Sequence, residues 1–431
     1  MTACKCLLLL FLFLVTPVTS AAPPIERWQT ASGVRVLFVE SHALPIVDIQ
    51  VDFAAGTAYE NFAQAGIASL TRELVELGVA GMDETQIASR MADVGAQLSG
   101  EVDRDRASII LRTLSMGDKR RVAFELLRAI LSTPQFPAAV FEREKARSLA
   151  ALKEALTRPE ALVKRAFWSA MYGSHPYGRH ETTESLATLE RADVLAFHAA
   201  HYTAPRARLA IVGDLSRAQA EAVAEELTAA LATSPGMTAI AVPELPSSSE
   251  QRIAHPAVQA HLLLGLPALK RGDPDFFPLI VGNYTLGGGG FVSRLMKAVR
   301  DQRGFAYSVH SHFQPLAQLG PFEIGLQTKK EQAQDALAVT REVLASFLRE
   351  GPSDEELLAA KQNLIGSFPL HLDSNREILR SVAVIGFYEL PLDYLDRYSD
   401  NIEEVTLSDI KAAFARRVRP EHLVTVIVAG E

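Results

Sequence analysis

Hydrophobic and polar residues alternate along residues 46–53, where Asp48, Gln50 and Asp52 separate apolar side chains. A period of two is typical of a β-strand with one face buried and one face in solvent. Residues 34–39 form a second β-rich run just before it. Together the two segments predict a β-hairpin that turns at residues 42–45.

A different period follows. Apolar residues recur at helical spacing in several long segments, and this spacing predicts helices over residues 65–79, 84–94, 119–131 and 138–156. Two further helical segments each lead into an apolar β-rich run that ends in glycine: 189–202 before 208–213, and 405–418 before 422–430. Each helix begins near an aspartate, and each run follows a proline. Two copies of one helix–strand unit are the simplest explanation, and a chance match is the alternative.

Residues 233–250 separate these copies and contain three prolines, a glycine and a serine triplet. This composition is typical of a linker between domains. We therefore predict an N-terminal domain over residues 23–232, a linker over 233–250 and a C-terminal domain over 251–431. Strands flanked by long helices favour an α+β fold with two homologous halves, each an antiparallel sheet with helices packed on one face.

The first 22 residues differ from the rest. Lys5 precedes an unbroken apolar run over residues 7–15, and small residues follow up to Ala22. This order predicts a secretory signal peptide over residues 1–22. A membrane anchor is the alternative, but the run is short for a span. Cys4 and Cys6 both lie in this segment, so the mature chain would contain no cysteine ligand, disulfide or thiolate. We expect a secreted protein, and a bacterial periplasm fits best.

Composition excludes some partners. The 431 residues are 48% hydrophobic and 22% charged, and 43 Lys and Arg against 51 Asp and Glu give a net charge of −8. Without a basic block, nucleic acid is not an expected partner. Beyond the N-terminus, no apolar run reaches the roughly 18 residues that a membrane span needs.

The most specific motif lies in residues 286–313, which read LGGGGFVSRLMKAVRDQRGFAYSVHSHF. This segment, and the helical segment 65–79 with Gly56 and Glu60 before it, resemble the pitrilysin and mitochondrial-processing-peptidase family. Members of that family are inverted zincins whose zinc motif is H-x-x-E-H. The resemblance covers nearly the whole mature chain, and it implies that the halves form part of a clamshell chamber.

At the zinc motif the chain departs from the family. Ser69, Arg72 and Glu73 stand where the motif has His, Glu and His, and Ala150 stands in the region of the third ligand. A hydroxyl is a poor zinc ligand, and a guanidinium cannot act as a general base. We therefore predict no metal in this chain, and a surface ion pair of Arg72 with Glu76. A repurposed metal site is the alternative.

The second half keeps more of the family pattern. The resemblance implies that Arg300 and Tyr307 reach the scissile peptide, where a cation and a phenol can stabilise an oxyanion. We expect Arg300 to end a helix and Tyr307 to lie on the strand after the turn at residues 303–304. The alternative is that Arg300 binds a helix C-terminus and Tyr307 packs in the core. Gly287, Gly288, Gly289 and Gly290 predict a flexible loop rather than a phosphate-binding loop, because no Gly-Lys-Ser/Thr follows.

Several histidines are weaker candidates. His198 and His201 lie three residues apart at a helix end, and we interpret them as surface residues rather than metal ligands. His310 and His312 are predicted to share a strand face, opposite to that of Tyr307, and the sequence offers no third ligand beside them. His175 is interpreted as a turn residue.

The leading hypothesis is a non-catalytic, zinc-free subunit of a secreted heterodimeric zinc metallopeptidase. A homologous partner with an intact H-x-x-E-H motif would hold the zinc, and this chain would supply Arg300 and Tyr307 and help to bind peptide. The alternative is a non-enzymatic peptide-binding or scaffold subunit of a larger assembly. A stand-alone metallopeptidase with unconventional ligands is a third hypothesis.

Overall fold

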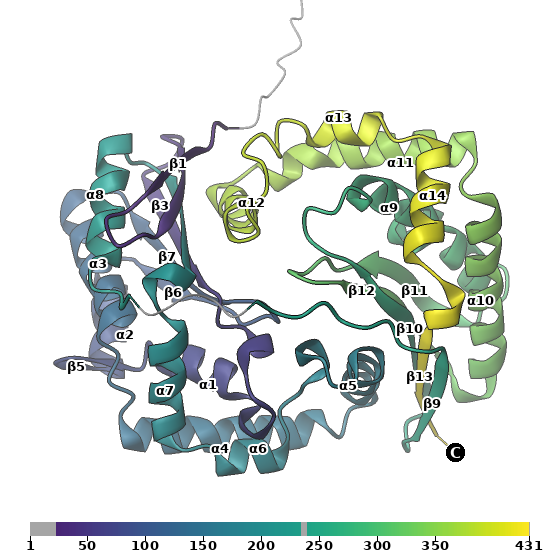
Figure 1. Cartoon of the computed structure of the whole chain (residues 1–431), viewed down its shortest axis with the longest axis horizontal. Helices are drawn as coiled ribbons and strands as arrows, with labels where there is room; N and C mark the ends of the chain where they lie inside the picture. The colour runs from purple at the N-terminus through teal and green to yellow at the C-terminus, as the bar shows by residue number, and fades with distance from the viewer. Residues whose placement is uncertain (1–22, 234–238, 431) are drawn as a thin grey trace, which may run out of the picture.

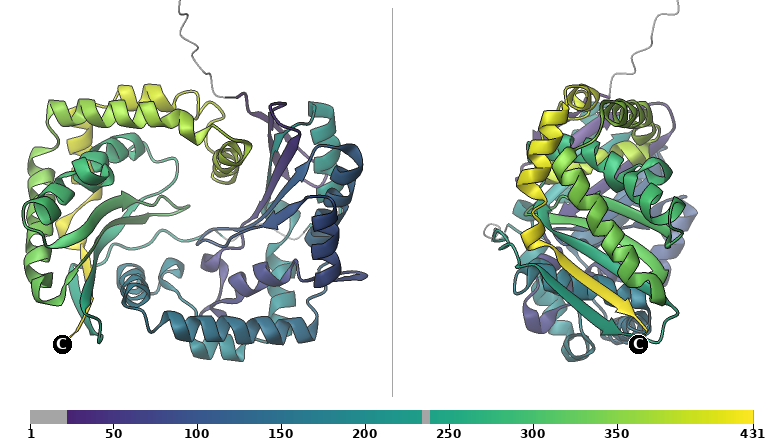
Figure 2. Two further views of the ribbon diagram at one scale, coloured as in Figure 1. Left: turned by 180° about the vertical axis from the view of Figure 1, so that it is seen from behind. Right: turned by 90° about the vertical axis from the view of Figure 1, so that its right-hand side faces the viewer.

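The computed structural model describes residues 23–233 and 239–430. Two large sheets face one another across the middle of the molecule, and helices lie on the outer side of each (Figures 1 and 2). The predicted signal segment, residues 1–22, and part of the predicted linker, residues 234–238, lie outside the described residues. Residues 239–248 form neither helix nor strand.

The N-terminal half contributes one six-stranded sheet, a short β4–β5 hairpin and eight helices of the described chain. Its strands are β1 (Glu26–Gln29), β2 (Arg35–Glu40), β3 (Ile46–Phe53), β4 (Gly78–Val79), β5 (Met82–Asp83), β6 (Gln97–Ser99), β7 (Ala107–Leu114) and β8 (Ala207–Gly213). Its helices are α1 (Ile67–Leu74), α2 (Glu84–Asp93), α3 (Gly117–Ser132), α4 (Ala138–Ala155), α5 (Pro159–Tyr172), α6 (Thr183–Thr188), α7 (Arg191–His201) and α8 (Arg217–Thr228).

The C-terminal half is built around a five-stranded sheet. Its strands are β9 (Ser249–Ala254), β10 (Gln259–Leu269), β11 (Ala306–Phe313), β12 (Gly320–Lys329) and β13 (Val424–Ala429). Its helices are α9 (Phe276–Asn283), α10 (Ala333–Glu350), α11 (Asp354–Ser367), α12 (Asn375–Phe387), α13 (Tyr398–Glu403) and α14 (Leu407–Arg417), with π-helical turns at Tyr284–Gly288 and Met296–Asp301.

The strand orders of the two sheets correspond. The larger sheet runs β1-β2-β8-β3-β7-β6, and the smaller one runs β9-β13-β10-β12-β11 when it is followed from the β9 edge. In each sheet the strand after the repeated helix, β8 or β13, is parallel to one neighbour and antiparallel to the other. The units α7–β8 and α14–β13 therefore occupy equivalent places, as the internal repeat predicts.

Two predictions about the sheets are wrong. The hairpin at residues 42–45 does not form, because β8 inserts between β2 and β3 and pairs with both. The sheets are also mixed rather than antiparallel, since β2 pairs with β8 and β9 pairs with β13 in parallel. A strand from far along the chain supplies the central pairing in each case.

Each half also covers one face of the other half's sheet. The side chains of α12 form an apolar cluster with Leu37, Val39 and Val212 on the inner face of the N-terminal sheet. The side chains of α5 form another with Val424 and Val426 of the C-terminal sheet. Figure 1 shows both helices between the sheets. The prediction of helices on one face only is therefore wrong, because each sheet has its own helices outside and a helix of the other half inside.

This exchange explains the polar residues of β3. Asp48, Gln50 and Asp52 are buried, although their alternation predicts a solvent-facing surface. Arg112 of β7 donates to Asp48 at 2.7 and 3.0 Å, and Arg106 forms an ion pair with Asp52 at 3.2 Å. The pairing of the charges permits their burial.

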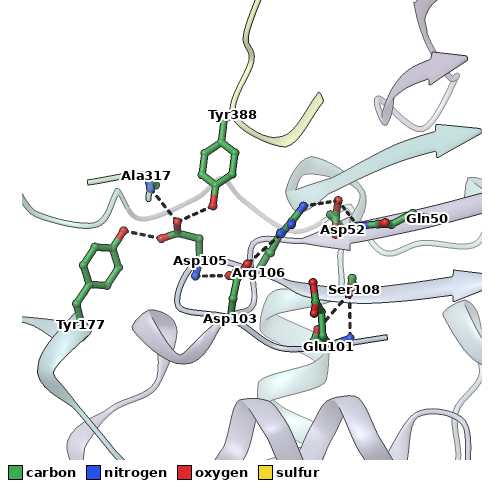
Figure 3. A network of polar contacts seen from close by, with 10 residues as sticks. All are labelled: Gln50, Asp52, Glu101, Asp103, Asp105, Arg106, Ser108, Tyr177, Ala317 and Tyr388. Atoms are coloured by element: carbon green, nitrogen blue, oxygen red, sulfur yellow. Dashed lines mark hydrogen bonds and ion pairs between the residues drawn. The ribbon is translucent and has the colours of Figure 1, made fainter. Parts of the chain in front are cut away.

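A buried carboxylate joins the two halves (Figure 3). Asp105, in the loop before β7, accepts hydrogen bonds from the hydroxyl of Tyr177 at 2.5 Å and from that of Tyr388 at 2.9 Å. The backbone N–H of Ala317 donates to it at 2.8 Å. Tyr177 belongs to the N-terminal half, whereas Ala317 and Tyr388 belong to the C-terminal half. Burial raises the pKa of Asp105, while the three donors oppose that rise.

Among residues 23–233 and 239–430, no helix has the length and apolar character to cross a membrane.

Candidate functional site

Helix α1 carries the positions that correspond to the zinc motif. The helix begins after Gly66, whose backbone is left-handed (φ 101°), and the buried carboxylate of Glu60 accepts the N–H of Ala68 in its first turn at 2.9 Å. A carboxylate at this end offsets the unpaired N–H groups and the helix dipole. The predicted helix over residues 65–79 is shorter in the structure, because Val79 already pairs in β4.

Arg72 is not the surface residue that the sequence predicts. It is 5% exposed, and it donates through Nη2 to the carbonyl of Ser99 at 2.7 Å and through Nε to the carbonyl of Ser108. The predicted ion pair with Glu76 does form, at 3.2 Å. A Cβ at Gly100 would lie 2.1 Å from Nη2 of Arg72, so glycine there makes room for the guanidinium. Arg72 thus holds α1 against β6 and β7.

The contacts of Arg72 give a stability prediction. Arg72→Met should lower the free energy of unfolding by about 1–3 kcal/mol, because two backbone carbonyls lose their donors inside the protein. Glu76→Gln, which removes only the ion pair, should cost less than about 0.5 kcal/mol. Urea unfolding of the two variants measures both. Equal losses would show that the ion pair, and not the carbonyls, is what Arg72 provides.

The other positions of the motif are also unsuited to zinc. Ser69 is exposed on α1, and Glu73 forms an ion pair with Arg147 of α4. Ala150 is exposed on α4 and has no ligand atom in its side chain. The only carboxylate at the motif positions is therefore already paired with a cation, and no imidazole is present.

The pocket beside these residues is cationic. It has a volume of about 590 Å³ and is lined by Ser69 and Ala151 together with Arg104, Arg158, Lys164 and Arg165. Its one lining carboxylate, Glu181, accepts from Arg165 at 2.9 Å. Desolvation lowers the pKa of His180, also in the lining, to about 3, so that imidazole is neutral. A divalent cation would be repelled here, so the residues present do not fit the family's zinc.

The two residues of the C-terminal motif lie at the surface. Arg300 is in the π-helical turn Met296–Asp301, where its guanidinium lies 4.8 Å from the ring centroid of Phe291 and 3.5 Å from a carboxylate oxygen of Asp301. Tyr307 is on β11 and is 91% exposed. The alternative that Tyr307 packs in the core is therefore wrong, and both side chains are accessible to another molecule.

The glycine segment is closely packed at Gly287 and Gly289, whereas Gly288 and Gly290 are exposed. Gly287 and Gly288 belong to a π-helical turn, and a Cβ at Gly287 would lie 2.4 Å from Oγ of Ser311. A Cβ at Gly289 would lie 2.7 Å from the carbonyl of Tyr284. Gly290 has a positive φ of 61°. Glycine is therefore needed here for close approach and for a left-handed turn.

His198 and His201 are partly buried, which corrects the prediction of surface residues. The ring of His198 stacks on Tyr202 at 4.8 Å and meets Phe136 at 5.3 Å, and its Nε2 is buried without a hydrogen bond among the described residues. Desolvation lowers the pKa of each of the two imidazoles to about 4. His175 is a turn residue as predicted, since its Nδ1 accepts the N–H of Tyr177 at 3.1 Å.

The sequence misses a third group beside His310 and His312. Glu323 of β12 lies directly opposite His312 in the β11–β12 pair. The ligand atoms of His310, His312 and Glu323 all lie within 4.8 Å of one another. Burial lowers the pKa of both imidazoles and raises that of the carboxyl group. A prediction that residues 306–329 form a β-hairpin with its turn between residues 313 and 320 would have placed Glu323 opposite His312.

The predicted faces of β11 also need correction. The prediction that Tyr307 lies opposite the two histidines assumed unbroken alternation. A register shift lies between Ala306 and Val309, and both of these residues pack in the core. Alternation is therefore interrupted at the position of Tyr307.

Comparisons with known proteins agree with this architecture. Residues 35–183 match the family described as insulinase (peptidase family M16), and residues 188–364 match the peptidase M16 inactive domain. The crystal structure of a peptidase M16 inactive domain from Pseudomonas fluorescens is 37% identical, with a TM-score of 0.91, and the match covers 94% of this chain and 98% of that one.

Curated relatives carry two kinds of name. A protein of Helicobacter pylori named non-peptidase homolog YmxG is 26% identical over 92% of each chain. A Bacillus subtilis protein named uncharacterized zinc protease YmxG is 26% identical over 81% of this chain and 85% of its own. The family matches and the 37% identity confirm the resemblance seen in the sequence: this chain belongs to peptidase family M16, the insulinase and pitrilysin family.

Proposed function

We propose that this chain is the zinc-free subunit of a secreted heterodimeric zinc metallopeptidase, in which it helps to bind peptide and supplies Arg300 and Tyr307 to the partner's active site. The partner is a homologous subunit that carries H-x-x-E-H and holds the zinc. The two subunits, or the two halves of each, enclose the peptide in a clamshell chamber.

The state of the zinc-motif positions carries this proposal. Arg72 is committed to two backbone carbonyls and Glu73 to Arg147, and the adjacent pocket is lined by four cationic side chains. Hydrolysis of a peptide bond by this family needs a metal-activated water, so the chain depends on another source of zinc. The name of the Helicobacter pylori relative, a non-peptidase homolog, supports the same conclusion.

The accessibility of Arg300 and Tyr307 supports the role in trans. A guanidinium and a phenol that project from the surface can donate to a substrate carbonyl and to the oxyanion that develops from it. Tyr307 also lies on β11, which is an edge strand of its sheet. An extended peptide can add to such an edge through backbone hydrogen bonds.

Reconstitution with the homologous partner subunit tests this proposal. The purified chain should cleave no peptide alone, and the co-purified pair should be active. Arg300→Ala and Tyr307→Phe should each lower kcat/KM of the pair by about 100-fold without preventing assembly, the loss typical of an oxyanion donor. Arg303→Ala and Ser308→Ala, exposed neighbours of the two residues, serve as matched controls and should leave kcat/KM unchanged.

Two outcomes would redirect the proposal. Chelator-sensitive peptidase activity of the lone chain would favour a stand-alone enzyme. Peptide binding without cleavage, indifferent to substitution of Arg300 and Tyr307, would favour a non-enzymatic scaffold subunit, which the name of the Helicobacter pylori relative also suggests.

Export to the bacterial periplasm is part of the proposal and rests on residues 1–22. Cell fractionation of the protein expressed with and without those residues tests it.

A further inference from the structure

We propose that His310, His312 and Glu323 form a binding site for a divalent transition metal. These residues lie in the C-terminal half, whereas the positions of the family's zinc motif lie in the N-terminal half. Two imidazoles and a carboxylate are a ligand set that suits zinc and its neighbours in the first transition series. This site departs from the sequence prediction of a metal-free chain. Its metal would be distinct from the catalytic zinc, which the proposed function assigns to the partner subunit, so the two proposals are independent.

The strand pairing sets the geometry. His312 and Glu323 are direct partners across the β11–β12 pair, and His310 lies two residues before His312 on the same strand. The two imidazole rings are nearly parallel, with centroids 5.9 Å apart and an interplanar angle of 18°. Three side chains from two paired strands therefore converge on one point, with the backbone fixed by the sheet.

The backbone also makes room for the ligands. A Cβ at Gly325 would lie 3.0 Å from Cε1 and 3.1 Å from Nε2 of His310, so the imidazole lies over a position without a side chain. Ligand atoms around a tetrahedral zinc stand about 3.4 Å apart. Metal binding would therefore require these ligand atoms, which lie within 4.8 Å of one another, to move closer by rotation of partly exposed side chains.

The three side chains have no competing partners. Within residues 23–233 and 239–430, none of them makes a hydrogen bond or an ion pair. The carboxylate oxygens of Glu323 and the ring nitrogens of the two imidazoles are therefore available to a bound cation. Three protein ligands would leave at least one position for water or another ligand.

Among the residues that the structure describes, Lys164 of α5 is the cationic side chain whose charge lowers the pKa of both His312 and Glu323. It comes from the other half of the chain and would oppose a bound dication. Its removal should therefore tighten metal binding, whereas removal of a ligand should weaken it.

The experiment is a titration of the metal-free full chain with Zn²⁺, and separately with Co²⁺, whose visible spectrum reports its ligands. We expect one equivalent to bind. His310→Ala, His312→Ala and Glu323→Gln should each weaken binding by at least about 100-fold, and Lys164→Met should strengthen it by about threefold to tenfold. His371→Ala, an exposed histidine elsewhere, and Ser69→Ala, at the family zinc position, should change nothing.

Folding is checked by the thermal unfolding of each metal-free variant, with His312→Gln as a milder second replacement. Binding weaker than about 10 μM in the wild type, or unchanged in His310→Ala and His312→Ala, would overturn the proposal. Loss of binding in Ser69→Ala would move the metal to the family position instead. Peptidase activity is not a readout, so the outcome does not depend on the proposed heterodimer.

Discussion

Asp105→Ala is expected to lower the free energy of unfolding by about 3 kcal/mol, because one buried and two partly buried donors lose their acceptor. These are the hydroxyls of Tyr177 and Tyr388 and the N–H of Ala317. Both phenols are largely buried, and desolvation raises their pKa, so they remain donors over the accessible pH range. Because the acceptor joins the two halves, loosening of the junction should accompany the loss of stability.

Urea unfolding measures the stability, and limited proteolysis within residues 233–250 measures the loosening. Tyr388→Phe, which removes one of the three donors, should cost only about 1 kcal/mol. Asp373→Ala, at an exposed aspartate, is the matched control and should cost less than about 0.5 kcal/mol. If Asp105→Ala unfolded like Asp373→Ala, the junction would depend on apolar packing alone.

His198→Phe should remove part of the acid sensitivity of the fold. The pKa of His198 is about 4 in the folded protein against 6.5 in the unfolded chain, because burial disfavours the charged ring. The unfolded chain therefore binds a proton in this window that the folded protein does not. This contribution to stability is complete above pH 6.5 and is lost as the pH falls toward 4. The loss amounts to on the order of 3 kcal/mol.

Phenylalanine keeps the ring contacts with Phe136 and Tyr202 and cannot be protonated. The variant should match the wild type at pH 7.5 and should become more stable relative to it as the pH falls to 4. Chemical unfolding at four pH values gives this difference, in which the other titrating groups cancel. His371→Phe, at an exposed histidine, should show no such gain, and an equal gain in both variants would contradict the assignment to burial.

Local structure was largely predictable from the sequence. Residues 46–53 form β3 at the predicted bounds, and the helical spacing of 84–94 and 138–156 locates α2 and α4 to within one residue. Pairing was not predictable, because β8 lies more than 150 residues after β3 in the chain and local patterns do not report such contacts. The burial of Asp48 and Asp52 depends on the same distant contacts, with α12 supplying the cover.

The candidate site also has features that the sequence predicts and features that depend on contacts between distant residues. That Ser69, Arg72 and Glu73 cannot hold zinc follows from their chemistry, whereas the burial of Arg72 depends on Gly100 and on carbonyls of β6 and β7. The exposure of Tyr307 depends on packing, since a tyrosine on a strand can face either way. Glu323 could not be predicted from residue spacing along one strand, because the pairing register between β11 and β12 brings it close to His312.

The exchange of α5 and α12 between the halves has a consequence for synthesis. The apolar inner face of the N-terminal sheet, with Val39 and Val212, is complete when β8 leaves the ribosome, but its cover is α12, about 160 residues later. At translation rates of about 5–20 residues per second, roughly 8–30 s pass before α12 has been synthesised and can cover that surface. During this interval the nascent chain exposes an apolar, aggregation-prone sheet face, and a chaperone that binds this face would raise the yield of folded protein.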